Sequence, residues 1–281
     1  MDSTLADKYI LVTGATSGMG KVTAQRLAER GATVVIVGRN AEKTQATMEE
    51  IQQRVPKSAV RSLVADLTSR AQVRALAQAY RDTYPRLDVL VNNAGGMFGA
   101  RQLSSDGLEM TFALNHMAYF VTTELLRPRL KPGARIVTTA SNAHRGAKLD
   151  FDDLQSRKWY SGFPVYSKSK LCNILFNRAL ARRLKGSGVT ANALHPGFVA
   201  TRFGDNSGGL MRAVFKVAKP IGAISPEEGA RTITYLASAP EVADISGEYF
   251  YECKIATPSP EARNDEDAER LWEISEGIAA L

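Results

Sequence analysis

Two residues with complementary acid–base chemistry, Tyr166 and Lys170, lie four positions apart in a stretch that is typical of a helix. That spacing puts both side chains on one helix face, about one turn apart. A phenol is a poor acid or base at neutral pH because its reference pKa is about 10. A fixed ammonium nearby favours the phenolate and lowers that pKa. The pair is therefore a candidate proton donor and acceptor for a carbonyl/alcohol couple, although the spacing alone is weak evidence and needs context.

The elements that must position this pair alternate between apolar, β-branched runs and helical stretches. Strands are expected at Tyr9–Thr13, Thr33–Gly38, Val60–Ala65, Leu87–Val91, Ala134–Ala140, Val189–Leu194 and Glu248–Tyr251. Helices are expected at Gly18–Arg30, Ala41–Arg54, Arg70–Thr83, Asp106–Leu130, Tyr160–Lys185 and Pro226–Ala239. Several strands are continuously apolar, as is usual for strands that are buried on both faces. The alternation predicts an α/β fold with a doubly wound parallel sheet (Rossmann) of about seven strands and helices on both faces.

The organisation of the chain indicates one unit. We see no linker, internal repeat or low-complexity segment, so we expect residues 1–281 to form a single domain. The segment 145–159 fits the alternation poorly, and so does Arg202–Ile224. In the latter, a Gly-rich hinge precedes a short amphipathic piece, which predicts a substrate lid at about 202–224. A surface loop with a capping helix is the alternative.

Composition excludes several classes of protein. The formal charge is +7, but the charges are dispersed with no run of five Lys or Arg, which favours a solvated surface and an anionic cofactor over nucleic acid. No apolar run reaches the length of a membrane helix and no secretory signal is visible, so we expect no membrane anchor. Cys172 and Cys253 show no metal or disulfide spacing, which predicts a cytoplasmic protein. With three His and no H-E-x-x-H, we expect no metal.

A glycine-rich turn, Thr13–Gly20, follows the first predicted strand directly and opens the first helix. Its glycines at 14, 18 and 20 allow tight turning and a close approach of the backbone. The N–H groups at the helix start then favour a pyrophosphate. A βα turn without a ligand is the alternative, but the position between a first strand and a first helix favours a dinucleotide.

The end of the second predicted strand distinguishes the two nicotinamide cofactors. In an NAD site an acidic residue at this position bonds the ribose 2′-OH. Here the strand ends Val37-Gly38-Arg39-Asn40, with no acid at its tip. A carboxylate would repel a 2′-phosphate, whereas a guanidinium can bind one through two hydrogen bonds. Arg39 therefore predicts NADP(H), and a solvated residue at a strand end is the alternative.

The chain resembles the short-chain dehydrogenase/reductase superfamily in motifs that span most of its length. In order, these are Thr13–Gly20, Asp66, Asn92-Asn93-Ala94-Gly95, Asn115, Ser141, Tyr166 with Lys170, and Pro196-Gly197 followed by Thr201. It resembles most closely the retinol-dehydrogenase-like branch, which includes relatives of protochlorophyllide reductase. That likeness lies in Asp153-Leu154-Gln155, Tyr166–Asn173, Ala191–Gly197 and Leu271–Glu276. Many membrane-bound members of the branch begin with a hydrophobic anchor that this chain does not show.

The resemblance implies a role for each of four residues. Tyr166 is then the general acid in reduction and the general base in oxidation, and Lys170 lowers its pKa and bonds the nicotinamide ribose. Ser141 hydrogen-bonds the substrate oxygen. Asn115 positions a water that links Lys170 to solvent. The alternative from the local sequence is that Ser141 caps the next segment and that Asn115 is a buried amide whose hydrogen bonds are satisfied by protein.

The resemblance also implies a cofactor site. Asp66 and Leu67 contact adenine, and Pro196, Gly197 and Thr201 hold the amide end of the nicotinamide. The full expected set is Gly14, Thr16, Ser17, Gly18, Met19, Gly20, Arg39, Asp66, Leu67, Asn92, Ala94, Gly95, Tyr166, Lys170, Pro196, Gly197, Val199 and Thr201.

The substrate pocket is less clearly marked. Candidate walls, which ordinary core and lid packing would also explain, are Gly96, Met97, Phe98, Gly99, Trp159, Phe198, Phe203, Leu210, Met211 and Phe215. We expect an NADP(H)-dependent carbonyl reductase or alcohol dehydrogenase for a small apolar carbonyl or alcohol. Reduction of a C=C bond, or NADP(H) binding without turnover by a sensor or scaffold, are the alternatives. Relatives are often dimers or tetramers packed through the long helices, so a homodimer or tetramer is expected.

Overall fold

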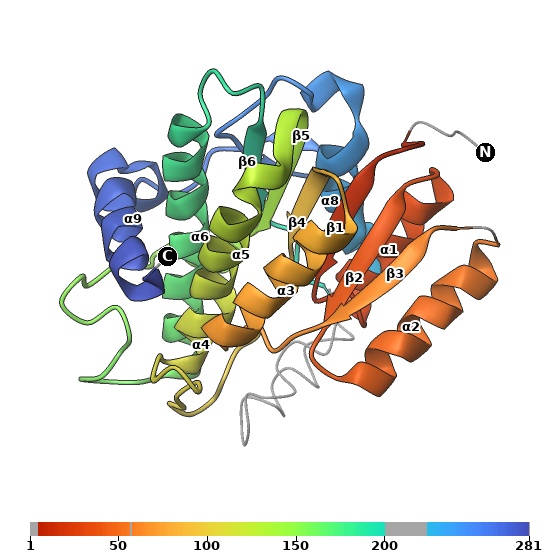
Figure 1. Cartoon of the computed structure of the whole chain (residues 1–281). Helices are drawn as coiled ribbons and strands as arrows, with labels where there is room; N and C mark the ends of the chain where they lie inside the picture. The colour runs from red at the N-terminus through yellow and green to blue at the C-terminus, as the bar shows by residue number, and fades with distance from the viewer. Residues whose placement is uncertain (1–4, 57, 200–223, 281) are drawn as a thin grey trace.

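The computed structural model describes residues 5–56, 58–199 and 224–280, and these build one eight-stranded sheet with the order β3-β2-β1-β4-β5-β6-β7-β8 (Figure 1). Strands β1 to β7 pair in parallel and β8 pairs antiparallel with β7. Their bounds are β1 Tyr9–Thr13, β2 Thr33–Gly38, β3 Val60–Val64, β4 Leu87–Asn92, β5 Leu130–Thr139, β6 Thr190–Leu194, β7 Tyr249–Tyr251 and β8 Lys254–Ile255. The strand order reverses between β1 and β4, and such a switch point opens a crevice at the carboxyl ends of the strands.

Helices cover both faces of the sheet, as predicted. In Figure 1, α3, α5, α6 and α9 lie on one side, and α1, α2 and α8 lie on the other, each group over its own apolar cluster. The helices are α1 Gly18–Glu29, α2 Ala41–Arg54, α3 Arg70–Thr83, α4 Met110–Phe112, α5 Ala118–Leu126, α6 Gly162–Arg183, α8 Pro226–Ser238 and α9 Asp265–Ala279. A π-helical turn occupies Ala113–Met117, and 3₁₀ turns occupy Arg127–Arg129, Asn142–His144, Pro240–Val242 and Glu261–Arg263.

The predicted doubly wound parallel sheet is confirmed, and all seven predicted strands are present. The eighth, β8, is a short antiparallel addition that follows a turn through Glu252 and Cys253, both with left-handed backbone (φ 48° and 62°). Neither residue is a typical turn residue for that conformation, so the sequence carried no signal for the hairpin. Helix α8 is capped at its start, because the Ser225 hydroxyl accepts the N–H of Glu228 at 3.1 Å.

One predicted helix, Asp106–Leu130, is wrong in its continuity. The helical backbone begins only at Met110, because Gly107 has a left-handed φ of 75° and closes a turn on Ser104. The buried Glu109 carboxylate then caps the start by accepting two backbone N–H groups, those of Thr111 and Phe112. The π turn Ala113–Met117 follows, and the helix ends at Leu126. Strand β5 starts at Leu130, four residues before the predicted start, and residues 131–133 of this added part are exposed.

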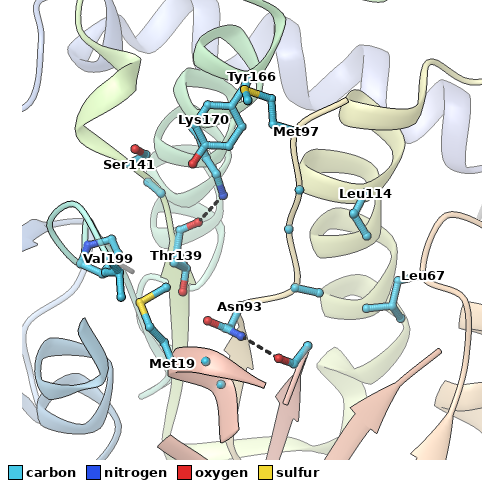
Figure 2. Close-up of a pocket in the computed structure, with 18 of the residues that line it drawn as sticks. Met19, Leu67, Asn93, Met97, Leu114, Thr139, Ser141, Tyr166, Lys170 and Val199 are labelled. Atoms are coloured by element: carbon cyan, nitrogen blue, oxygen red, sulfur yellow. Dashed lines mark hydrogen bonds between the residues drawn. The ribbon is translucent and has the colours of Figure 1, made fainter. Parts of the chain in front are cut away.

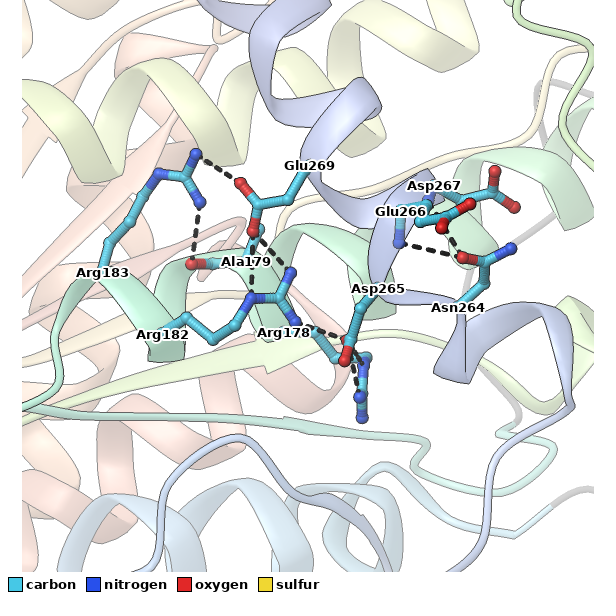
Figure 3. Close-up of polar contacts among 9 residues, drawn as sticks. All are labelled: Arg178, Ala179, Arg182, Arg183, Asn264, Asp265, Glu266, Asp267 and Glu269. Carbon is cyan, nitrogen blue, oxygen red and sulfur yellow. Dashed lines mark hydrogen bonds and ion pairs between the residues drawn. The ribbon is translucent and has the colours of Figure 1, made fainter.

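Sequence reasoning did not predict helix α9, although its start carries a clear signal. Asn264 accepts the N–H groups of Glu266 and Asp267, and three acidic residues occupy the first turn, where the helix dipole favours negative charge. Figure 3 shows Arg178, Arg182 and Arg183 of α6 reaching the two carboxylates of α9. Those carboxylates belong to Asp265 and Glu269. Partly exposed pairs of this kind contribute about 0–1 kcal/mol each, so they orient α9 more than they stabilise it.

The stability of the α9 contact comes from its buried face. Trp272 is 2% exposed and lies 4.8 Å from the ring of Phe120 in α5 and 5.8 Å from the ring of Phe176 in α6. At the far end of α9, Arg70 and Arg74 of α3 donate to its last backbone carbonyls. The helix therefore completes the core on this side of the sheet.

Within the described ranges, no helix has both the length and the apolar character needed to cross a membrane. Likewise, no three His, Cys, Asp or Glu residues among residues 5–56, 58–199 and 224–280 gather in a way that could hold a metal ion.

Candidate active site

A cavity of about 1330 Å³ lies at the carboxyl ends of the parallel strands, across the switch point between β1 and β4. Most of the predicted site residues line it. These are Gly14, Thr16, Ser17, Gly18, Met19, Gly20, Arg39, Asp66, Leu67, Ala94, Gly95, Ser141, Tyr166, Lys170, Pro196, Gly197 and Val199. Asn92 and Asn115 do not line it, and Thr201 lies outside the described residues, as does the predicted lid apart from Ile224.

The glycine turn forms one end of the cavity, and its glycines are sterically required. Gly14 has a left-handed φ of 64°, and a Cβ there would lie 2.6 Å from Cα of Ala94. A Cβ on Gly20 would lie 2.5 Å from the Asn93 amide nitrogen. Ser17 precedes α1 but gives it no side-chain cap, so the backbone N–H groups at the helix start are not used by that side chain. This geometry suits the pyrophosphate of a dinucleotide.

Two basic residues lie at the end of β2. Arg39 lines the cavity there, and so does Lys43 in the first turn of α2. Asn40 between them caps α2 by accepting the N–H of Lys43 at 2.8 Å, which fixes the turn that carries both side chains. Sequence reasoning missed Lys43, although its spacing of four from Arg39 beside an Asn cap was a usable signal. The pair gives this end of the cavity a positive charge that suits a phosphate monoester.

The structure distinguishes the two asparagines that follow β4. The Asn92 side chain is fully buried and donates to the Thr123 hydroxyl at 3.0 Å, away from the cavity. Asn93 instead lines the cavity (Figure 2), and its amide donates to the carbonyl of Thr13 at 2.9 Å. Successive side chains of an extended segment point to opposite sides, so only one of the two can face the cavity. Asn92 therefore packs behind the site, and Asn93 ties β4 to the glycine turn.

Tyr166 and Lys170 lie on one face of α6 and point into the cavity together (Figure 2). The Lys170 ammonium nitrogen lies 5.7 Å from the centre of the Tyr166 ring and donates to the carbonyl of Thr139 at 2.9 Å. Asn173 donates to the same carbonyl at 3.1 Å. Lys170 is only 4% exposed, so its place is set by the end of β5 rather than by solvent. Cys172 is buried in the core, away from this face.

The protonation of this pair differs from the expectation that Lys170 lowers the pKa of Tyr166. Burial raises the pKa of Tyr166 to about 12, and a hydrogen bond from the Ser141 hydroxyl opposes that rise. Burial lowers the pKa of Lys170 to about 7. Desolvation is the largest cause of the pKa shift in both groups. Tyr166 is consequently a neutral phenol at physiological pH, and Lys170 is close to its own midpoint.

Ser141 lies two residues after the end of β5 and faces Tyr166 across the cavity (Figure 2). Its hydroxyl also accepts the N–H of Ala143 at 3.2 Å, which caps the 3₁₀ turn Asn142–His144. The cap and the contact with Tyr166 therefore coexist in one residue. A hydroxyl at this point can donate to an oxygen that Tyr166 also reaches.

Asn115 lies in the π turn and is fully buried. Its amide oxygen accepts the N–H of Gly96 at 2.8 Å, and its amide nitrogen donates to the carbonyl of Gly96 and to the Ser169 hydroxyl. Both polar groups of the side chain are thus satisfied by protein. A Cβ on Gly95 would lie 3.2 Å from the Asn115 oxygen and 3.5 Å from the Lys170 nitrogen. Asn115 therefore holds the loop after β4 against Lys170, and its predicted contact with water stays a prediction.

The substrate end of the cavity has apolar walls. Met97 and Phe98 are buried there, and Phe163 and Phe198 are half exposed at its edge. Trp159, a predicted wall, does not line the cavity and is 62% exposed. The remaining candidates Phe203, Leu210, Met211 and Phe215 lie outside the described residues, and Gly96 lines the cavity while Gly99 does not. Residues that sequence reasoning missed here include Leu114, Arg145, His195 and Tyr251.

Comparison with known proteins agrees with this geometry. The sequence profile of the short chain dehydrogenase family matches residues 8–208. Human retinol dehydrogenase 13 is 40% identical over 289 residues, which covers 99% of this chain and 86% of that protein. A crystal structure of an uncharacterised protein from Mycobacterium paratuberculosis superposes with a TM-score of 0.80 at 33% identity and covers 98% of this chain and 94% of that one. A short chain dehydrogenase from Burkholderia cenocepacia, solved in complex with NADP, superposes with a TM-score of 0.71 at 28% identity. That superposition covers 93% of this chain and 100% of the Burkholderia chain.

The fold and the cavity thus define a dinucleotide-binding α/β protein. The chain belongs to the short-chain dehydrogenase/reductase family of oxidoreductases. Within that family it is retinol-dehydrogenase-like, since the likeness extends over nearly its full length.

Proposed function

We propose that this protein is an NADP(H)-dependent oxidoreductase that interconverts an apolar alcohol and its aldehyde or ketone. The observation that carries the proposal is that Ser141, Tyr166 and Lys170 line the same cavity as the glycine turn. A dinucleotide seated on that turn would extend along the strand ends toward these three side chains. The apolar walls at Met97 and Phe98 and the 40% identity to a retinol dehydrogenase support an alcohol/aldehyde couple.

Proton transfer is the part of the reaction that this chain supplies. The nicotinamide, when bound, gives or accepts the hydride. Tyr166 donates its proton to the carbonyl oxygen during reduction, for which a buried, protonated phenol is suited. The Ser141 hydroxyl hydrogen-bonds the same oxygen as negative charge develops on it. In oxidation Tyr166 must accept a proton, and a protonated Lys170 nearby favours the phenolate that does so.

Preference for NADP(H) is proposed from the basic end of the cavity. Arg39 and Lys43 lie where the adenosine ribose of a bound dinucleotide would reach, and β2 ends without an acidic residue. The NADP complex of the Burkholderia relative supports the same choice. Arg39→Asp should weaken NADPH binding and shift preference toward NADH. Fluorescence titration of both nucleotides on both proteins tests this, and equal affinity of the unaltered protein for NADH and NADPH would refute the argument.

Turnover is tested by following NADPH oxidation with a panel of aldehydes, ketones and enones. We expect reduction of apolar aldehydes or ketones, and expect Tyr166→Phe to abolish it while NADPH still binds. Reduction of enones alone would favour the C=C reductase. Tight NADPH binding with no turnover on any compound would favour the sensor or scaffold. Unaltered turnover by Tyr166→Phe would remove Tyr166 from the mechanism.

Location and assembly are proposed on the sequence alone. We propose a cytoplasmic protein that assembles as a homodimer or tetramer. Cell fractionation and sedimentation of the purified protein test the two statements, and recovery in the membrane fraction or a monomer at working concentration would contradict them.

A further inference from the structure

His144 ends the 3₁₀ turn that follows Ser141, and its imidazole is fully buried. Its Nδ1 lies 2.7 Å from the carbonyl oxygen of Ser141, and its Nε2 lies 3.1 Å from the backbone nitrogen of Ser259. The ring also packs edge-on against Tyr249 in β7, with the centroids 5.3 Å apart. One side chain therefore joins the loop after β5, at Ser141, to the segment that precedes α9.

The two partners of the ring determine its protonation. A carbonyl oxygen can only accept, so Nδ1 must carry the proton, and a backbone N–H can only donate, so Nε2 must accept. A doubly protonated ring would direct an N–H of its own at the N–H of Ser259. The geometry thus requires the neutral Nδ1–H form. Burial lowers the pKa of His144, which also favours the neutral ring. The charged or titratable groups that act on His144 are Arg145, Glu261 and His195.

The contact from His144 holds the backbone carbonyl of Ser141, and the orientation of that peptide affects where the Ser141 side chain points. The Ser141 carbonyl accepts from the backbone N–H of His144 at 3.2 Å as well as from the imidazole, so one residue holds it twice. The Ser141 hydroxyl must meet both the N–H of Ala143 and the phenol of Tyr166. A rotation of the Ser141 peptide would turn the hydroxyl away from one or both. Arg145 adds a second tie, because its guanidinium donates to the carbonyl of Thr257 at 2.7 Å.

We propose that His144 is a positioning residue for Ser141, whose Nδ1–H holds the peptide so that the hydroxyl stays directed at Tyr166. This inference rests on the proposed function, because His144 acts only through the Ser141–Tyr166 contact. It also gives the chain from Thr257 to Ser259 a share in shaping the site, since that segment fixes the ring from its other side.

Two substitutions separate the two ends of the ring. His144→Gln places an amide near Nε2, where it can accept from Ser259, but leaves no donor at Nδ1. His144→Asn keeps an N–H near Nδ1 and loses the acceptor for Ser259. We expect His144→Gln to lower kcat about tenfold, the ratio that one lost neutral hydrogen bond supplies, with the KM for NADPH unchanged. The pH midpoint of kcat for alcohol oxidation should rise, because the Ser141 hydrogen bond lowers the pKa of Tyr166.

The matched variant His144→Asn should keep the wild-type pH midpoint while its melting temperature falls. The groups whose charge also bears on that midpoint, Lys170, Tyr119 and Tyr249, are unchanged in both proteins. A wild-type kcat and midpoint in folded His144→Gln would overturn the proposal, as would the same upward shift in both variants.

A double-mutant cycle with Ser141→Ala distinguishes this inference from the proposed function. If His144 acts through Ser141, His144→Gln causes no further loss of kcat in the Ser141→Ala background. Independent, additive losses would overturn the positioning role and leave the proposed function standing. Undiminished turnover by Ser141→Ala alone would instead refute the proposed function.

One measurement needs no variant and so does not depend on folding of a substituted protein. Nitrogen NMR of the protein labelled with ¹⁵N-histidine reports which ring nitrogen carries the proton. We expect one buried ring to stay neutral and protonated at Nδ1 across the physiological pH range, and expect His144→Gln or His144→Asn to remove that signal. A His144 ring protonated at Nε2, or one that titrates in this range, would overturn the proposal.

Discussion

Replacement of Lys170 by methionine should stabilise the fold while it abolishes turnover. Lys170 is 4% exposed, and its one hydrogen bond to the residues that the structure describes goes to the carbonyl of Thr139. Asn173 also donates to that carbonyl. Its pKa is about 7 in the folded chain against an ordinary value of 10.5. Because the folded pKa is the lower one, the unfolded chain binds more protons between these two values, and stability rises with pH across that window. The free-energy cost of burying the charged Lys170 amine is fully present below pH 7 and is lost by about pH 10.5.

The size of this free-energy cost follows from about 1.4 kcal/mol for each unit that separates the folded and unfolded pKa values of Lys170. At pH 7 the buried amine costs about 4 kcal/mol, and methionine of similar length avoids that cost while it loses a hydrogen bond worth about 1 kcal/mol. Lys170→Met should therefore raise the free energy of unfolding by about 3 kcal/mol at pH 7, and the gain should vanish near pH 10.

Urea denaturation of the nucleotide-free protein at several pH values between 7 and 10 tests this reasoning, with the difference between the two proteins as the quantity compared. Lys168→Met is the matched control, since the same substitution two positions earlier in α6 removes only a half-buried lysine. A stability difference that does not change with pH, or a Lys170→Met protein less stable than the wild type at pH 7, would show that the buried charge is already compensated.

Four further outcomes are expected. Gly20→Ala should weaken NADPH binding about tenfold or more by titration, because its Cβ would meet the Gly14 carbonyl at the phosphate turn. Trp272→Ala should lower the free energy of unfolding by about 3–5 kcal/mol in urea, since it empties a buried aromatic contact. Ser225→Ala should cost about 1 kcal/mol in the same assay through loss of the α8 cap, and no change would show that the cap contributes nothing. Tyr166 should stay protonated to pH 10 in the nucleotide-free protein, so an ultraviolet difference spectrum against Tyr166→Phe that shows phenolate below pH 9 would contradict its burial.

The sequence predicted correctly those helices whose ends are set by contacts between residues close together in the chain. The predicted bounds of α2 and α3 match the structure because Asn40 and Ser69 cap them through contacts three residues away. The π turn escaped prediction since it depends on Asn115 bonding Gly96 and Ser169, which lie 19 and 54 positions away. No local pattern reports such distant partners. The helix pattern of α9 was present but was read only as part of a family motif.

The parts of the site that the sequence predicted depend on local patterns, whereas the parts that it did not predict depend on contacts between residues far apart in the chain. The glycine turn, Arg39, Tyr166 and Lys170 could be placed at the cavity because each follows a strand end or shares a helix face. The pKa values could not, because they depend on how deeply both side chains are buried. The contact between His144 and Ser259 spans 115 positions and depends on the orientation of one ring.

Helix α9 has a consequence for how the chain folds during synthesis. Strands β1 to β6 and helix α6 leave the ribosome before α9, but the apolar surface around Phe120 and Phe176 is covered only when Trp272 arrives. Domains begin to fold from their N-terminal parts as they are made, and transiently exposed apolar surface promotes aggregation. The nascent protein therefore passes through a stage in which the sheet and helices α3, α5 and α6 are made but the apolar patch at Phe120 and Phe176 is still uncovered, and aggregation is favoured in this interval.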